Sequence, residues 1–73
     1  MRAQLIEALQ EHAKGHIAKH KANVEVLLEK INGIAEHPDV VETIEKELGI
    51  IAEYDDQLEI LNKYFIVKDP FKS

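Results

Sequence analysis

Three of the four histidines recur at every fourth residue in the N-terminal half of the chain, at His12, His16 and His20. A spacing of four places side chains on the same side of a helix, so two neighbouring imidazoles can bind one metal ion. Each step of four also turns by about 40° around the helix axis, so the outer two rings diverge. Asp55 lies opposite His16 in the helix pairing derived below. His16, His20 and Asp55 are therefore the candidate metal ligands.

The same side chains also have a structural interpretation, which the sequence favours. Polar residues within an apolar helix interface form hydrogen-bonded layers that fix the register between helices. The Glu-x-x-His repeat of di-iron bundles is absent, because no glutamate stands three residues before His12, His16 or His20. We therefore expect a buried layer of histidine and aspartate, with no bound metal and no cofactor.

The residues needed for covalent catalysis are almost missing. Outside tyrosine, the only hydroxyl groups are those of Thr43 and Ser73, and the chain has no cysteine. Nucleophilic catalysis depends on such groups, and the sequence has no glycine-rich phosphate-binding loop either. The sequence therefore predicts a non-enzymatic protein without catalytic residues.

Length and charge limit the classes of protein further. Seventy-three residues allow one domain, and the net charge of −5 disfavours nucleic acid as a partner, since phosphate binding requires a basic surface. No run of 18 apolar residues exists, so no membrane span is expected. The N-terminus lacks the apolar core of a signal peptide, and a cytoplasmic location is therefore predicted.

Apolar and histidine side chains follow one another at steps of three and four in the first half of the chain. They are Ile6, Leu9, Ala13, His16, Ile17, His20, Val24, Leu27 and Ile31. This pattern predicts an amphipathic helix over about residues 2–31, roughly 45 Å long. Asn32-Gly33 favours a helix end, and Pro38 suits the first position of a second helix. The sequence thus predicts a turn over 32–37, a helix over about 38–65 and a tail over 66–73.

The second predicted helix carries its own stripe, whose members are Val41, Ile44, Leu48, Ile51, Asp55, Leu58, Asn62 and Phe65. Val40, Tyr54 and Leu61 widen this stripe on one side. A connection of about six residues makes the two helices antiparallel neighbours. If facing residue numbers add up to about 71, His16 meets Asp55 and His20 meets Ile51. The predicted fold is all-α, a single antiparallel two-helix hairpin domain over residues 1–73.

A lone hairpin leaves more apolar side chains than two helices can bury. A chain of this length buries only about 60% of its extended surface, and without cysteine it gains nothing from disulfides. We therefore expect a homodimer in which two hairpins form a four-helix bundle. The expected interface residues are Ile17, Leu28, Ile50, Tyr54 and Leu61.

Several stretches resemble a family of small proteins from marine tailed bacteriophages of the T4-like group. They are His20–Glu29, Glu36–Asp39, Glu53–Asp56 and Tyr64-Phe65. The similarity covers about residues 12–65, but the family tends to carry Asn-Pro-Val-Gly where this chain has Lys30-Ile31-Asn32-Gly33. The family has no assigned function, so the resemblance implies an origin in a phage and a location in the host cytoplasm.

The functional prediction is a non-enzymatic, self-associating helical protein, with a role in phage assembly or host interaction implied by the resemblance. Two alternatives stay open. The first is a metal-binding four-helix bundle that uses His16, His20 and Asp55. The second is a small regulator that binds an amphipathic helix of another protein through its exposed apolar stripe.

Overall fold

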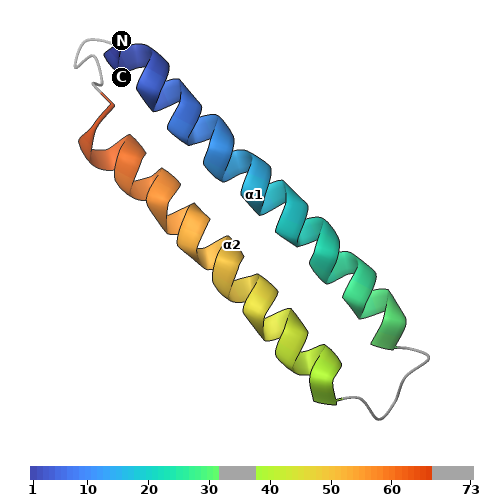
Figure 1. The fold of residues 1–73 in the computed structure, drawn as a ribbon. Coiled ribbons are helices and arrows are strands. Elements are labelled where there is room, and N and C mark those ends of the chain that lie inside the picture. The colour runs from blue at the N-terminus through green and yellow to red at the C-terminus, as the bar shows by residue number, and fades with distance from the viewer. Residues whose placement is uncertain (32–37, 67–73) are drawn as a thin grey trace, which may run out of the picture.

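The computed structural model describes residues 1–31 and 38–66, which form two antiparallel α-helices lying side by side (Figure 1). Helix α1 spans Arg2–Ile31 and helix α2 spans Pro38–Tyr64. The described residues contain no strand, and the predicted all-α helical hairpin is confirmed. The bounds of α1 coincide with the predicted ones, and α2 ends one residue early. The predicted turn over 32–37 and most of the predicted tail, residues 67–73, lie outside the described residues.

Charged side chains at both ends of α2 complement its dipole. At the start of α2, Asp39 places a negative charge in the first turn, and the Thr43 Oγ1 hydroxyl donates to the Asp39 carbonyl over 2.7 Å. At its end, the Phe65 N–H donates to the Leu61 carbonyl over 3.0 Å, and Lys63 complements the helix dipole. Of these features, the charges of Asp39 and Lys63 favour the observed ends of α2, because each complements the helix dipole.

Each helix contributes a regular stripe of half-buried or buried side chains to the seam between the helices. On α1 the stripe is Ile6, Gln10, Ala13, Ile17, His20, Val24 and Leu27. On α2 it is Val40, Ile44, Glu47, Ile51, Tyr54, Leu58 and Leu61. Both stripes alternate steps of three and four, which is the seven-residue repeat of a coiled coil. The hairpin is therefore a short antiparallel coiled coil.

The observed seam differs from the predicted stripe of α2. Ile44, Ile51 and Leu58 belong to both, but Asp55 and Asn62 are exposed, and Tyr54 and Leu61 take their places in the seam. The predicted members Val41, Leu48 and Phe65 are exposed as well. Both stripes hold six apolar side chains, but the observed one buries a single polar residue whose oxygens are hydrogen-bonded, whereas the predicted one would bury two polar residues. The observed pairing of the two helices is also displaced by about one helical turn from the predicted pairing.

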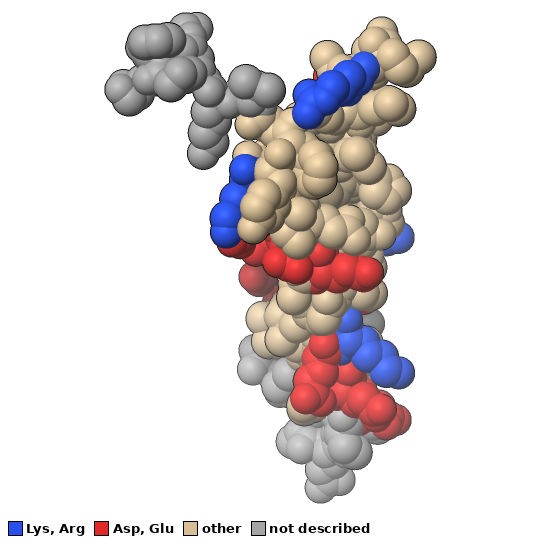
Figure 2. Space-filling model, turned by 90° about the vertical axis from the view of Figure 1, so that its left-hand side faces the viewer, with Lys and Arg blue, Asp and Glu red and all other residues tan. Residues whose placement is uncertain are grey.

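The hairpin is a single layer of helices. Its dimensions are 55 × 25 × 15 Å, and the smallest one is little more than the width of one helix with its side chains. Among the described residues only Ala13 is buried, with 3% of its surface exposed. Figure 2 shows a mostly uncharged surface, crossed by basic side chains, at the end where α1 begins and α2 ends, with bands of acidic side chains farther along. Two helices alone therefore form a seam but no core.

Gly15 and Gly49 lie in helix interiors and have free space around them. A Cβ atom built on either residue meets nothing within 4 Å. We therefore expect Gly15→Ala and Gly49→Ala each to raise the free energy of unfolding by about 1 kcal/mol, since alanine costs less backbone entropy in a helix. Urea unfolding followed by circular dichroism, at fixed protein concentration, measures the change. Destabilisation by Gly15→Ala would instead mean that another chain packs closely against that residue.

Candidate functional site

A hydrogen-bonded polar layer crosses the seam between the helices. The Glu47 carboxylate on α2 accepts two hydrogen bonds from α1. His20 Nδ1 donates to its Oε2 atom, and Asn23 Nδ2 donates to its Oε1 atom over 3.2 Å. The side chains of His20 and Glu47 are only 12% and 17% exposed. A carboxylate only accepts hydrogen bonds, so His20 Nδ1 carries the proton in this arrangement. Both oxygens of a mostly buried acid are thus satisfied.

A ladder of rings lies beside this layer. The His12 and His16 centroids are 4.4 Å apart, and those of His16 and His20 are 6.0 Å apart. Tyr54 of α2 stacks on His16 at 4.5 Å with an angle of 11° between the rings, and it meets His12 edge-on at 5.8 Å. The three histidines therefore share one side of α1, with Tyr54 inserted against the first two.

His16 occupies the least favourable electrostatic position in the ladder. Burial lowers the pKa of its imidazole below the usual 6.5, and the neighbouring His12, His20 and Lys19 lower it further. Its Nδ1 atom is buried and has no hydrogen-bond partner among the described residues. This environment favours the neutral ring.

The predicted His16–Asp55 pair is wrong. Asp55 is exposed, and the α2 side chain that packs against His16 is Tyr54. His20 likewise meets Glu47 and not the predicted Ile51, which shifts its partner toward the start of α2 by one turn. Within residues 1–31 and 38–66, no group of three or more histidine, cysteine, aspartate or glutamate side chains is arranged to hold a metal ion. The chain thus brings His16 and His20 together, but not with Asp55.

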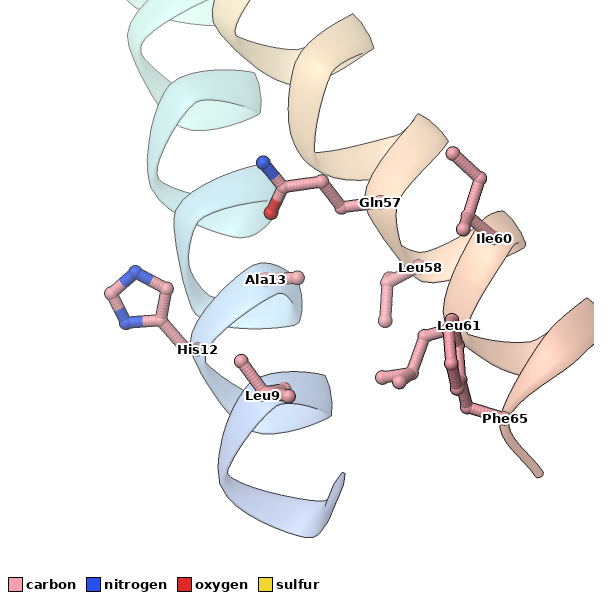
Figure 3. Close-up of a pocket in the computed structure, with 8 residues that line it drawn as sticks. All are labelled: Leu9, His12, Ala13, Gln57, Leu58, Ile60, Leu61 and Phe65. Carbon is pink, nitrogen blue, oxygen red and sulfur yellow. The ribbon is translucent and has the colours of Figure 1, made fainter. Parts of the chain in front are cut away.

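An apolar groove of about 220 Å³ opens beside the ladder, toward the end where α1 begins (Figure 3). Its lining residues are Leu9, His12, Ala13, Gln57, Leu58, Ile60, Leu61 and Phe65. In the close-up, Leu58 and Leu61 point from α2 toward α1. The groove has no formally charged side chain in its lining, so its surface is suited to apolar contacts.

The residues predicted for a dimer interface fall into three settings. Ile17, Tyr54 and Leu61 are half-buried members of the seam, whereas Ile50 is half-buried just beside it. Leu28 is exposed. The seam therefore already uses three of the five, and only the exposed parts of these side chains are open to a partner.

Sequence reasoning missed Glu47 and Asn23, although a signal for Glu47 was present. Val40, Ile44, Ile51, Tyr54, Leu58 and Leu61 leave one polar position in their seven-residue pattern, and that position is Glu47. The predicted stripe had two polar members, Asp55 and Asn62, so a comparison of the two patterns favours the observed one. Nothing in the spacing identified Asn23 as the second donor.

Comparisons with family models, with curated proteins and with solved structures find no match for this chain. Neither described helix contains a stretch long and apolar enough to cross a membrane. Any functional proposal must therefore rest on the geometry of α1 and α2.

The polar layer generates a test of the register. Glu47→Ala leaves His20 and Asn23 without their acceptor, so we expect it to lower the free energy of unfolding by about 1.5–3 kcal/mol. Asp55→Ala removes an exposed carboxylate from the same helix and should change stability by less than about 0.5 kcal/mol. Urea unfolding at fixed protein concentration compares the two variants. A larger loss for Asp55→Ala would mean that Asp55, and not Glu47, faces the seam.

The lowered pKa of His16 generates a prediction of pH dependence. Since the folded chain holds this ring neutral, its contribution to stability is complete above pH 6.5 and is lost as the pH falls through the lowered pKa. We expect the loss of stability between pH 7.5 and pH 5 to be smaller in His16→Gln than in the unmodified chain. NMR titration of the ring provides a direct measurement, and a midpoint above 6.5 would contradict the assignment.

Proposed function

We propose that this chain is a non-enzymatic, self-associating helical protein whose partner is a second copy of itself. The observation that supports the proposal is the absence of a core within the described residues, where Ala13 alone is buried. Stable domains consist of at least two packed layers, but this hairpin is one layer 15 Å thick. A second hairpin supplies the missing layer and gives a four-helix bundle.

The exposed surface is large enough for such a partner. The chain exposes 6046 Å², whereas a compact monomer of 8.3 kDa exposes about 4,600 Å². The excess is greater than the roughly 800 Å² that each partner buries in a standard protein–protein interface. Exposed Leu5, Leu9, Ile60, Tyr64 and Phe65 contribute to it. Association of two copies would remove apolar area from water at about 25 cal/mol per Å².

One face of the hairpin is better suited to this contact than the other. We call it the histidine face and define it by Leu9, His12 and His16 of α1 with Ile50, Gln57 and Ile60 of α2. Ile50 stands seven residues before Gln57 and so lies on the same side of α2. None of these six side chains carries a formal charge when the histidines are neutral, so their own burial desolvates no charged group. The charged residues of this face, Lys19, Lys46 and Glu53, lie beside them.

The opposite face carries charges close to its apolar residues. A shallow hollow there is lined by Lys21, Glu25 and Leu48, together with seam residues. Leu28 follows Lys21 by seven residues and lies on this side, so the proposed interface does not include it. Burial of this face would require Lys21 and Glu25 to be desolvated, which costs free energy unless each finds a partner.

The other functions considered from the sequence have less support in the geometry. A metal site within one chain lacks its third ligand, because Asp55 is exposed away from His16. Binding of another protein's amphipathic helix would use the same groove as the second copy, and it is an alternative outcome of the experiment below. A role in phage assembly or host interaction rests on the resemblance of residues 12–65 and stays a prediction.

The choice of face is tested by two matched substitutions. Leu9 on the histidine face and Leu48 on the opposite face are 57% and 51% exposed, and leucine and lysine have similar helix propensities. We expect Leu9→Lys to raise the dimer dissociation constant at least about tenfold, because each buried leucine contributes about 1.5–3 kcal/mol. Leu48→Lys should change it less than about threefold. Sedimentation equilibrium measures both, with circular dichroism to verify that the helices are retained.

Two results would contradict the proposal. The first is an unmodified chain that sediments at 8.3 kDa at every concentration tested, which would exclude the second copy as the partner. The second is a dimer that Leu48→Lys disrupts and Leu9→Lys does not, which would place the interface on the opposite face. A chain that is monomeric alone but binds a synthetic amphipathic helix would favour the regulator.

A further inference from the structure

When the helices of two hairpins run along one another, two-fold symmetry allows two ways to pack their histidine faces together. If the axis runs parallel to the helices, like ends of the two copies meet, and α1 of one copy lies across α2 of the other. If the axis runs across the helices, opposite ends meet, and each helix lies across its own counterpart. Both arrangements are isologous, since the same surface of each copy forms the contact. The two differ in which charges and which apolar residues are brought together.

The distribution of charge favours the first arrangement. Helix α1 carries five basic and four acidic side chains, whereas α2 carries two basic and eight acidic ones. An axis across the helices places the two acidic α2 helices side by side, and juxtaposed like charges oppose association. An axis parallel to the helices places each acidic α2 beside the nearly balanced α1 of the partner. Neighbouring helices are antiparallel in both arrangements, as in up-down-up-down bundles, so charge and not helix direction separates the two.

The distribution of apolar side chains points the same way. On the histidine face, exposed Leu5 and Leu9 lie near the start of α1, and exposed Ile60 and Tyr64 lie near the end of α2. Figure 2 shows mostly uncharged surface at this end of the hairpin.

The other half of the same face is polar. Thr43 and Lys46 stand 14 residues before Gln57 and Ile60 and so occupy the same side of α2, and Lys19 lies beside His16 on α1. When like ends meet, the apolar ends cover each other. When opposite ends meet, each apolar end faces the charged side chains of the other copy, which are Lys19, Lys46 and, seven residues before Ile60, Glu53.

We infer that two copies pair through their histidine faces in register, around an axis parallel to the helices, with α1 of each copy across α2 of the other. This inference rests on the proposed self-association and adds its orientation. It follows from two independent observations, the acidity of α2 and the apolar character of one end of the face. His16, at the midpoint of α1, lies at the middle of the interface in this arrangement.

The orientation can be measured with spin labels, because the chain has no cysteine and each introduced cysteine carries the only label. Gln4→Cys reports on the end of the hairpin, and Ala18→Cys reports on its middle. Both residues are exposed, and their separation of 14 residues places them on the same side of α1, away from the histidine face. Double electron–electron resonance on the labelled full-length chain measures the distance between the two labels of a dimer.

In-register pairing predicts similar distances at the two sites, within about 10 Å of each other. The reversed arrangement adds about 38 Å along the helix axis for Gln4→Cys but less than about 5 Å for Ala18→Cys, at 1.5 Å per residue. A long distance for Gln4→Cys with a short one for Ala18→Cys would therefore overturn the inference while leaving the proposed dimer intact. No dipolar signal at either site, with a monomer in sedimentation, would overturn the proposed function as well.

Discussion

The bond between His20 and Glu47 is the constraint on which the arrangement of the two helices depends. An acid within a helix seam is tolerated only if its oxygens are satisfied, and His20 and Asn23 satisfy both of them. A slide of the helices by one turn would break both of these bonds, so they favour the observed pairing. The same contact orients α2 so that Tyr54 reaches His16 and Asp55 is exposed.

A seam fixed in this way still provides little buried surface. Each helix places only one side chain in the seam at every step of three or four residues. Since the layer is 15 Å thick, apolar atoms on both of its faces stay in contact with water. The polar layer therefore specifies register, while in the proposed dimer a second layer supplies most of the apolar burial. This division between specificity and stability is common where polar residues occur in coiled coils.

The sequence predicted the fold well because the relevant signals are local. Apolar spacing, Asn32-Gly33 and Pro38 were enough for the helix bounds, and a short connection required an antiparallel pair. It predicted the site poorly because two overlapping stripes on α2 share Ile44, Ile51 and Leu58, and they differ by a modest rotation of the helix. The choice between them depends on which polar group finds a partner on α1. That is a property of two segments together, which neither pattern contains alone.

The order of contacts along the hairpin also affects how it opens. The contact between Asn23 and Glu47 joins residues 24 positions apart in the chain. The contact between the Arg2 side chain and the Phe65 carbonyl joins residues 63 positions apart. The entropy lost on closing a loop grows with the logarithm of its length, which makes the outer contact costlier by about 0.9 kcal/mol if each closed independently. Local fluctuations should therefore begin where α1 starts and α2 ends. The groove lies toward that end, so its shape is less fixed than the seam around His20 and Glu47.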